Sequence, residues 1–166
     1  MKCFLSNNHL QSVIALRINR SVMAIVCSVV LFSSNANAAM DEEQSLHFGT
    51  FALVNNTTVS TLKIFHTGAT PDASSKLYPL SFGQAGHYRL TAYPVFTPLT
   101  ITIADFTLNV GMAEPFTISA FTHDAIITDG AGEALLKLGA TLSTSGTGTN
   151  YGDAVYTGII DIQVSF

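Results

Sequence analysis

The sequence predicts an all-β protein, a single antiparallel two-sheet β-sandwich domain preceded by a helical signal peptide. Three observations lead to this prediction. Apolar and polar residues alternate along several short segments, Gly, Pro, Asn and Asp separate these segments, and one apolar run stands near the N-terminus. Sustained helical periodicity is missing from the sequence after that run.

Residues 1–38 contain the three parts of a secretory signal peptide. Lys2, Arg17 and Arg20 supply the positive part, and the apolar run Val22–Phe32 follows. Small and polar residues then lead to Ala36-Asn37-Ala38, which matches the A-x-A cleavage pattern. The apolar run is shorter than the roughly 20 residues that cross a bilayer. We therefore expect cleavage after Ala38 rather than a retained anchor.

The predicted mature domain, residues 39–166, lacks both cysteines of the chain, Cys3 and Cys27. No disulfide can form in it, although the export route leads to an oxidising compartment. It keeps eleven acidic and four basic residues, a formal charge of −7. We expect no nucleic-acid binding, because phosphate contacts need clustered Lys and Arg. We also expect no integral membrane segment after cleavage of the signal.

The clearest strand is the C-terminal one. Its even positions include Ile160, Ile162, Val164 and Phe166, and polar residues stand between the last of these. Such alternation is typical of a strand with one buried face. Further candidates are Leu46–Val54, Thr57–His66, Gly86–Tyr93, Leu99–Ile103 and Phe106–Val110, with loops at Pro71–Lys76 and Ser143–Gly152.

A hairpin is predicted over Phe116–Leu142. Its second half alternates from Ala134 to Leu142, and Asp129-Gly130 stands before that half. An Asp-Gly pair favours a tight reversal, because glycine accepts a positive φ without a Cβ clash. About eight short strands without helices indicate a two-layer sandwich, and a closed barrel is the competing architecture.

Residues with catalytic or ligand-binding chemistry form no known motif. The histidines of the mature domain have no metal-ligand spacing; they are His47, His66, His87 and His123. The densest polar cluster is interpreted as a solvated hairpin tip rather than a calcium loop; it consists of His123, Asp124, Asp129 and Glu133. Arg89 is expected to pair with an acid on a neighbouring strand. We expect no enzymatic activity, no metal and no cofactor.

The order of motifs along the domain carries more information than any single residue. Leu46-His47-Phe48-Gly49-Thr50 comes first, followed by the strand Gly86–Leu90 and the apolar Leu99–Ile103. Leu138-Gly139-Ala140-Thr141-Leu142 comes after the hairpin. The chain closes with Tyr156-Thr157-Gly158 and alternating residues to Phe166. This arrangement resembles the bacterial exported family catalogued as domain of unknown function 4402.

The resemblance implies similarity to fimbrial and spore-coat-U-like subunits of Gram-negative bacteria, which have immunoglobulin-like sandwiches. In such pilins the subunit lacks one strand, and first a periplasmic chaperone and then the next subunit supplies it by strand addition. The segment Ala39–Ser45 departs from the apolar donor of a pilin, because it contains three consecutive acids. Two alternatives stay open. Either Leu46–Val54 is the donor or edge strand, through Leu46, Phe48, Ala52 and Val54, or the domain folds complete and does not polymerise.

The expected function is that of a non-enzymatic structural or cell-surface protein in the periplasm, on the surface or in a fimbrium. Its expected partners are like subunits or a periplasmic chaperone. The alternative is a carbohydrate- or ligand-binding module, since sandwiches bind sugars through exposed aromatic rings. The candidate rings are Tyr78, Tyr88, Tyr93 and Tyr151.

Overall fold

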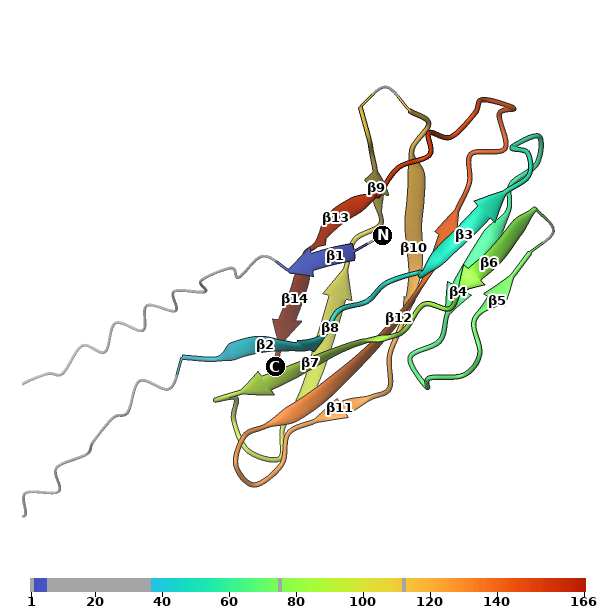
Figure 1. The fold of residues 1–166 in the computed structure, drawn as a ribbon. Coiled ribbons are helices and arrows are strands. Elements are labelled where there is room, and N and C mark those ends of the chain that lie inside the picture. The colour runs from blue at the N-terminus through green and yellow to red at the C-terminus, as the bar shows by residue number, and fades with distance from the viewer. Residues whose placement is uncertain (1, 6–36, 75, 112) are drawn as a thin grey trace, which may run out of the picture.

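The computed structural model describes residues 2–5, 37–74, 76–111 and 113–166 (Figure 1). These residues form strands, turns and loops and contain no helix, so the predicted all-β class is confirmed for them. The strands, in chain order, are β1 (Lys2–Leu5), β2 (Ala39–Gln44), β3 (Thr50–Leu53), β4 (Thr61–Ile64), β5 (Asp72–Ala73), β6 (Leu77–Ser81), β7 (Gly86–Thr91), β8 (Pro98–Ile103), β9 (Phe106–Leu108), β10 (Phe116–Thr122), β11 (Ile126–Ile127), β12 (Ala134–Ser143), β13 (Thr157–Ile160) and β14 (Ile162–Ser165).

The largest sheet is built around β12. The first half of β12 pairs with β7, and its second half pairs with β4 and β10, all antiparallel. β2 extends the sheet beyond β7, β9 beyond β10 and β5 beyond β4. This sheet curls strongly around the core (Figure 1).

Smaller antiparallel groups complete the domain. β8 pairs with β11 and with β14, and β3 pairs with β6. The buried side chains come from both the large sheet and these groups, an arrangement that fits a β-sandwich. The largest of the fully buried side chains are Tyr88, Phe48, Leu46, Leu62, Ile64, Leu90, Leu108, Ile118, Leu136, Leu138, Leu142 and Ile160.

The predicted hairpin exists, but its first strand is interrupted. β10 pairs with β12 with an irregular register between Ser119 and Thr122. The chain then crosses to the other group, where β11 pairs with β8. The role assigned to Gly130 was wrong, because Gly132 has the positive φ, +75°. A Cβ on Gly132 would lie 2.2 Å from the carbonyl oxygen of Tyr93, so this close approach also requires glycine.

Further segments differ from the sequence prediction: the predicted loop Pro71–Lys76 contains the short strand β5, and β6 was not predicted. The predicted C-terminal strand is divided at Asp161 into β13 and β14, which have different partners. The segment Ala39–Ser45, expected as an extension, contains the edge strand β2, which pairs with β7. An exposed edge strand tolerates acids, because their side chains stay in water.

Most of the predicted signal peptide, including Ala36, lies outside the described residues. Within it, Lys2–Leu5 form β1, and Ala38 is exposed directly before β2. Within the described part of the chain, we find no helix with the length and apolar character needed to cross a membrane.

Candidate functional site

An open groove lies between β3 and the chain that leads into β13. Its volume is about 840 Å³, within the range of ligand-binding sites in proteins. Val54, Leu80 and Val155 line it, and their side chains are 65%, 70% and 71% exposed. Exposed apolar side chains that gather on one part of a protein surface mark interaction sites. The groove is therefore the strongest candidate for a binding surface.

The floor of the groove is a cluster of packed aromatic rings. Phe116, in β10, is buried and stacks on Tyr151 with 4.1 Å between ring centroids. The rings of Tyr156 and Phe51 meet Phe116 edge-on, at 4.8 and 5.6 Å. Burial raises the pKa of Tyr156. Offset and edge-on ring contacts stabilise one arrangement, so the floor is preorganised.

Asn56 fixes the loop that forms one side of the groove. Its buried side-chain amide donates to the Ser145 hydroxyl (2.9 Å) and to the Thr149 carbonyl (3.0 Å), and its side-chain carbonyl accepts from the Gly146 amide (2.8 Å). The backbone of Asn56 also accepts from Gly148 at 2.7 Å. A buried amide with all these partners holds the loop Ser143–Gly152 against the start of the chain between β3 and β4.

The edge of β13 is open within the domain. Among the described residues, β13 has one hydrogen-bonded strand partner, β1, which runs parallel to it from Lys2↔Thr157 to Leu5↔Ile160. β1 belongs to the predicted signal peptide. The inner face of β13 is packed: Ile160 is 1% exposed, and a Cβ on Gly158 would lie 2.3 Å from Leu108. Ile159, on the other face, is 62% exposed.

The predicted donor or edge residues do not share one environment. Leu46 and Phe48 are fully buried in the core of their own domain. Ala52 is exposed, and Val54 borders the groove. In the terminal strand, Ile160 is buried, Ile162 and Val164 are half-buried, and Phe166 is 71% exposed.

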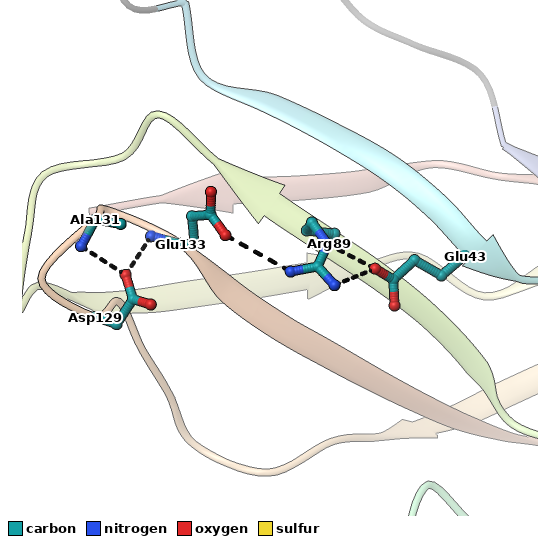
Figure 2. A network of polar contacts seen from close by, with 5 residues as sticks. All are labelled: Glu43, Arg89, Asp129, Ala131 and Glu133. Atoms are coloured by element: carbon teal, nitrogen blue, oxygen red, sulfur yellow. Dashed lines mark hydrogen bonds and ion pairs between the residues drawn. The ribbon is translucent and has the colours of Figure 1, made fainter.

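β2 is tied to its own sheet by an ion-pair network (Figure 2). Arg89, in β7, binds Glu43 at 2.5 Å and Glu133 at 3.6 Å, as expected for a cross-strand partner. The hydrogen bond and the charge of Glu43 raise the pKa of Arg89. The pairs are solvent-exposed and individually weak, but together with the β2–β7 ladder they commit Ala39–Gln44 to this domain.

The residues of the predicted hairpin-tip cluster have separate roles. The Asp129 carboxylate accepts from the backbone amides of Ala131 (2.8 Å) and Glu133 (2.9 Å), as Figure 2 shows. These two bonds, that of Glu133 first, lower the pKa of Asp129. His123 binds the backbone carbonyl of Asp124. In the part of the chain that the structure describes, no three His, Cys, Asp or Glu side chains are grouped as a metal site.

One histidine contacts both a hydroxyl and a carboxylate. His66 Nδ1 lies 3.2 Å from the Thr122 hydroxyl, and its Nε2 lies 3.2 Å from Asp124. These groups meet beside Gly139, where a Cβ would lie 2.8 Å from the Thr122 hydroxyl oxygen. In a catalytic triad the carboxylate is buried, whereas Asp124 is 74% exposed. The arrangement therefore fits a link between the ends of β4 and β10.

The tyrosines proposed for sugar binding are mostly packed. Tyr88 is buried, Tyr151 stacks on Phe116, and Tyr93 meets Phe166 edge-on at 5.9 Å. Tyr78 is 54% exposed. Sequence reasoning missed the groove residues Leu80 and Val155, because a single exposed apolar residue in a loop or edge strand has no periodic signal.

Comparison with protein-family models, with curated proteins and with solved structures gave no match for this chain.

Proposed function

We propose that this protein is a non-enzymatic, exported structural subunit with an immunoglobulin-like, fimbrial-type sandwich that assembles with another chain at β13 and the groove. One observation carries the proposal. Among the described residues, the only strand partner of β13 is β1, which comes from the predicted signal peptide. Cleavage after Ala38 would remove that partner and leave an unpaired edge.

An unpaired strand edge beside an apolar groove favours strand addition. Backbone N–H and C=O groups of β13 would bind an incoming extended segment, and the groove would receive its apolar side chains. The packed inner face of β13 keeps the edge in place without a partner, since Ile160 and Gly158 hold it against the core. The proposed partner is a like subunit or a periplasmic chaperone.

The proposed location is the periplasm, the cell surface or a fimbrium of a Gram-negative bacterium. The signal-like residues 1–38 support export, and the charge of −7 left after cleavage disfavours binding to anionic lipid or nucleic acid. The similarity of motif order to exported fimbrial-like domains supports the same location.

Hydrogen exchange on the exported protein tests the proposal. The full-length gene is expressed in an exporting Gram-negative host, and mass spectrometry identifies the N-terminus. We expect Ala39 at the N-terminus, fast exchange at the Thr157–Ile160 amides of the isolated subunit, and slow exchange at those β14 amides that bond to β8. The Thr157–Ile160 amides become protected in assemblies recovered from the cell surface.

The paired strand β14 is the internal control, because it lies next in the chain and has β8 as partner. Slow exchange at β13 in an isolated subunit lacking residues 1–38 would contradict the proposal. Retention of the unprocessed chain in the cytoplasm would also contradict it.

A further inference from the structure

Two overlapping Asn-x-Thr triplets stand in the connection between β3 and β4. They are Asn55-Asn56-Thr57 and Asn56-Thr57-Thr58, and residues 39–166 contain no other Asn-x-Ser or Asn-x-Thr triplet. Such triplets are acceptors of N-linked sugars, which are attached at surface loops of exported proteins. Because a turn between two strands also favours these residue types, the contacts of each asparagine decide whether it can accept a sugar.

Asn56 is committed to the interior of the domain. It is 4% exposed, and its Nδ2 amide group donates to the Ser145 hydroxyl at 2.9 Å and to the Thr149 carbonyl at 3.0 Å. These two bonds use both amide hydrogens that an asparagine has. A sugar on Nδ2 would replace one of them and would need space against the loop Ser143–Gly152. The folded domain therefore excludes Asn56 as an acceptor.

Asn55 has the opposite environment. It is exposed, and its Oδ1 accepts from the Thr57 hydroxyl at 3.0 Å and from the Thr57 backbone amide at 3.4 Å. These bonds use only the carbonyl side of the amide, and among the described residues the Asn55 Nδ2 group donates to none. Thr57 is exposed as well. Asn55 therefore presents to solvent both its nitrogen and the hydroxyl of its own triplet.

The contact between Asn55 and Thr57 suits the transfer of a sugar. An amide nitrogen is a weak nucleophile, because its lone pair is delocalised into the carbonyl group. It attacks once a base removes one of its protons, and hydrogen bonds donated to Oδ1 stabilise the negative charge that this removal leaves on the amide. The Thr57 hydroxyl already makes such a bond before any enzyme binds.

We propose that Asn55 is the acceptor of an N-linked sugar. The co-reactant is a glycosyl diphosphate, and a transferase of the producing cell catalyses the step. Nδ2 forms a bond to the anomeric carbon, the bond from that carbon to the diphosphate oxygen breaks, and the diphosphate leaves with the electron pair. The displaced amide proton passes to a base of the transferase. This inference goes beyond the proposed function, because it concerns a covalent modification rather than an assembly contact.

Asn55 lies at the end of the groove that is remote from β13. The next residue, Asn56, is bonded to Thr149, at the start of the chain that leads along the groove to β13. At the other end, the aromatic cluster on the groove floor links Phe51 to Tyr156, which comes directly before β13. A sugar at Asn55 therefore leaves the edge of β13 open to strand addition.

Mass spectrometry of the protein purified from the cells that naturally produce it tests the proposal. We expect an intact mass above that of the processed polypeptide by one or more sugar residues, and electron-transfer fragmentation should place the increment on Asn55. Thr57→Ala removes the hydroxyl of the Asn55 triplet and should abolish the increment. Asn55→Gln should abolish it as well, and circular dichroism checks that both variants fold like the wild type.

Thr58→Ala is the matched control, because Thr58 is exposed like Thr57 but supplies the hydroxyl of the Asn56 triplet. This variant should keep the full increment on Asn55. The proposal is overturned by a wild-type chain with the mass of the bare polypeptide, by an increment on Asn56, or by an increment that depends on Thr58 rather than on Thr57.

The N-terminus of the modified chain identifies the source of the sugar. A nucleotide-linked glycosyl diphosphate acts in the cytoplasm, so chains that still begin at Met1 would carry the increment too. A lipid-linked one acts after export, so only chains that begin at Ala39 would carry it. Either result supports Asn55 as the acceptor, and neither changes the hydrogen exchange expected at β13.

Discussion

β13 and β14 are consecutive four-residue strands separated by Asp161, yet their edges differ. β14 pairs with β8 along its whole length, from Ile162↔Ile103 to Ser165↔Thr100. β13 has no hydrogen-bonded strand partner within residues 37–166 of the described chain. The faces also differ, because Ile160 is buried whereas Ile162 and Val164 are half-buried.

The difference shows that the packing of a face and the pairing of an edge are separate properties of a strand. β13 is fixed through its face, and among the described residues its backbone pairs with β1 alone. β14 is held by its ladder with β8, and its half-buried Ile162 and Val164 pack against the core. An edge that is open while its face is packed suits strand addition, since the site exists before the partner arrives.

The largest expected effect on the free energy of unfolding comes from removing the buried side chain of β13. Ile160→Ala removes a buried side chain and leaves a cavity, so we expect unfolding to become easier by about 2–5 kcal/mol. Val164→Ala, the counterpart in β14, should cost about 1 kcal/mol, because Val164 is half-buried. Urea unfolding monitored by fluorescence and circular dichroism measures both. Equal costs would contradict the distinction between the two strands.

Asn56→Ala is expected to lower the free energy of unfolding by an intermediate amount, because Asn56 holds the loop that precedes β13. It leaves the Gly146 amide and the Thr149 carbonyl without their partner, which should cost about 1–3 kcal/mol. Asn55→Ala is the control, because Asn55 is exposed and accepts only from Thr57; it should stay within about 0.5 kcal/mol of wild type. Hydrogen exchange should accelerate at Ser145–Thr149 and not at β14. Acceleration at β14 instead would contradict the assigned role of Asn56.

The all-β class could be predicted because it depends on local alternation and turn residues. The alternation of Leu136, Leu138 and Leu142 is reproduced as buried positions of β12. β6 was missed, because Pro79 interrupts its pattern and most of its side chains are exposed. β2 was missed for a similar reason: its acids show no buried face.

The candidate site was harder to predict, because it depends on contacts between distant segments. Asn56 is the second residue of the turn-like run Asn55-Asn56-Thr57-Thr58, and nothing local reveals its bond to Ser145, 89 residues later. The split between β13 and β14 depends on which strands lie beside them, and alternation carries no information about neighbours. The turn at Asp129 was recognised, but the choice between Gly130 and Gly132 depends on the approach of Tyr93.

The smallest expected effect concerns the end of β14. Burial raises the pKa of Tyr93, whose ring meets Phe166 edge-on at 5.9 Å. Since the raised pKa belongs to the folded state, its contribution to stability is complete below the ordinary tyrosine pKa of about 10 and is lost as the pH rises through the folded value. Phe166→Ala uncovers the Tyr93 ring, so its pKa should fall toward the ordinary value. Absorbance titration at alkaline pH, with Tyr93→Phe identifying the Tyr93 signal, measures the shift. An unchanged Tyr93 titration would mean that Phe166 does not cover the ring.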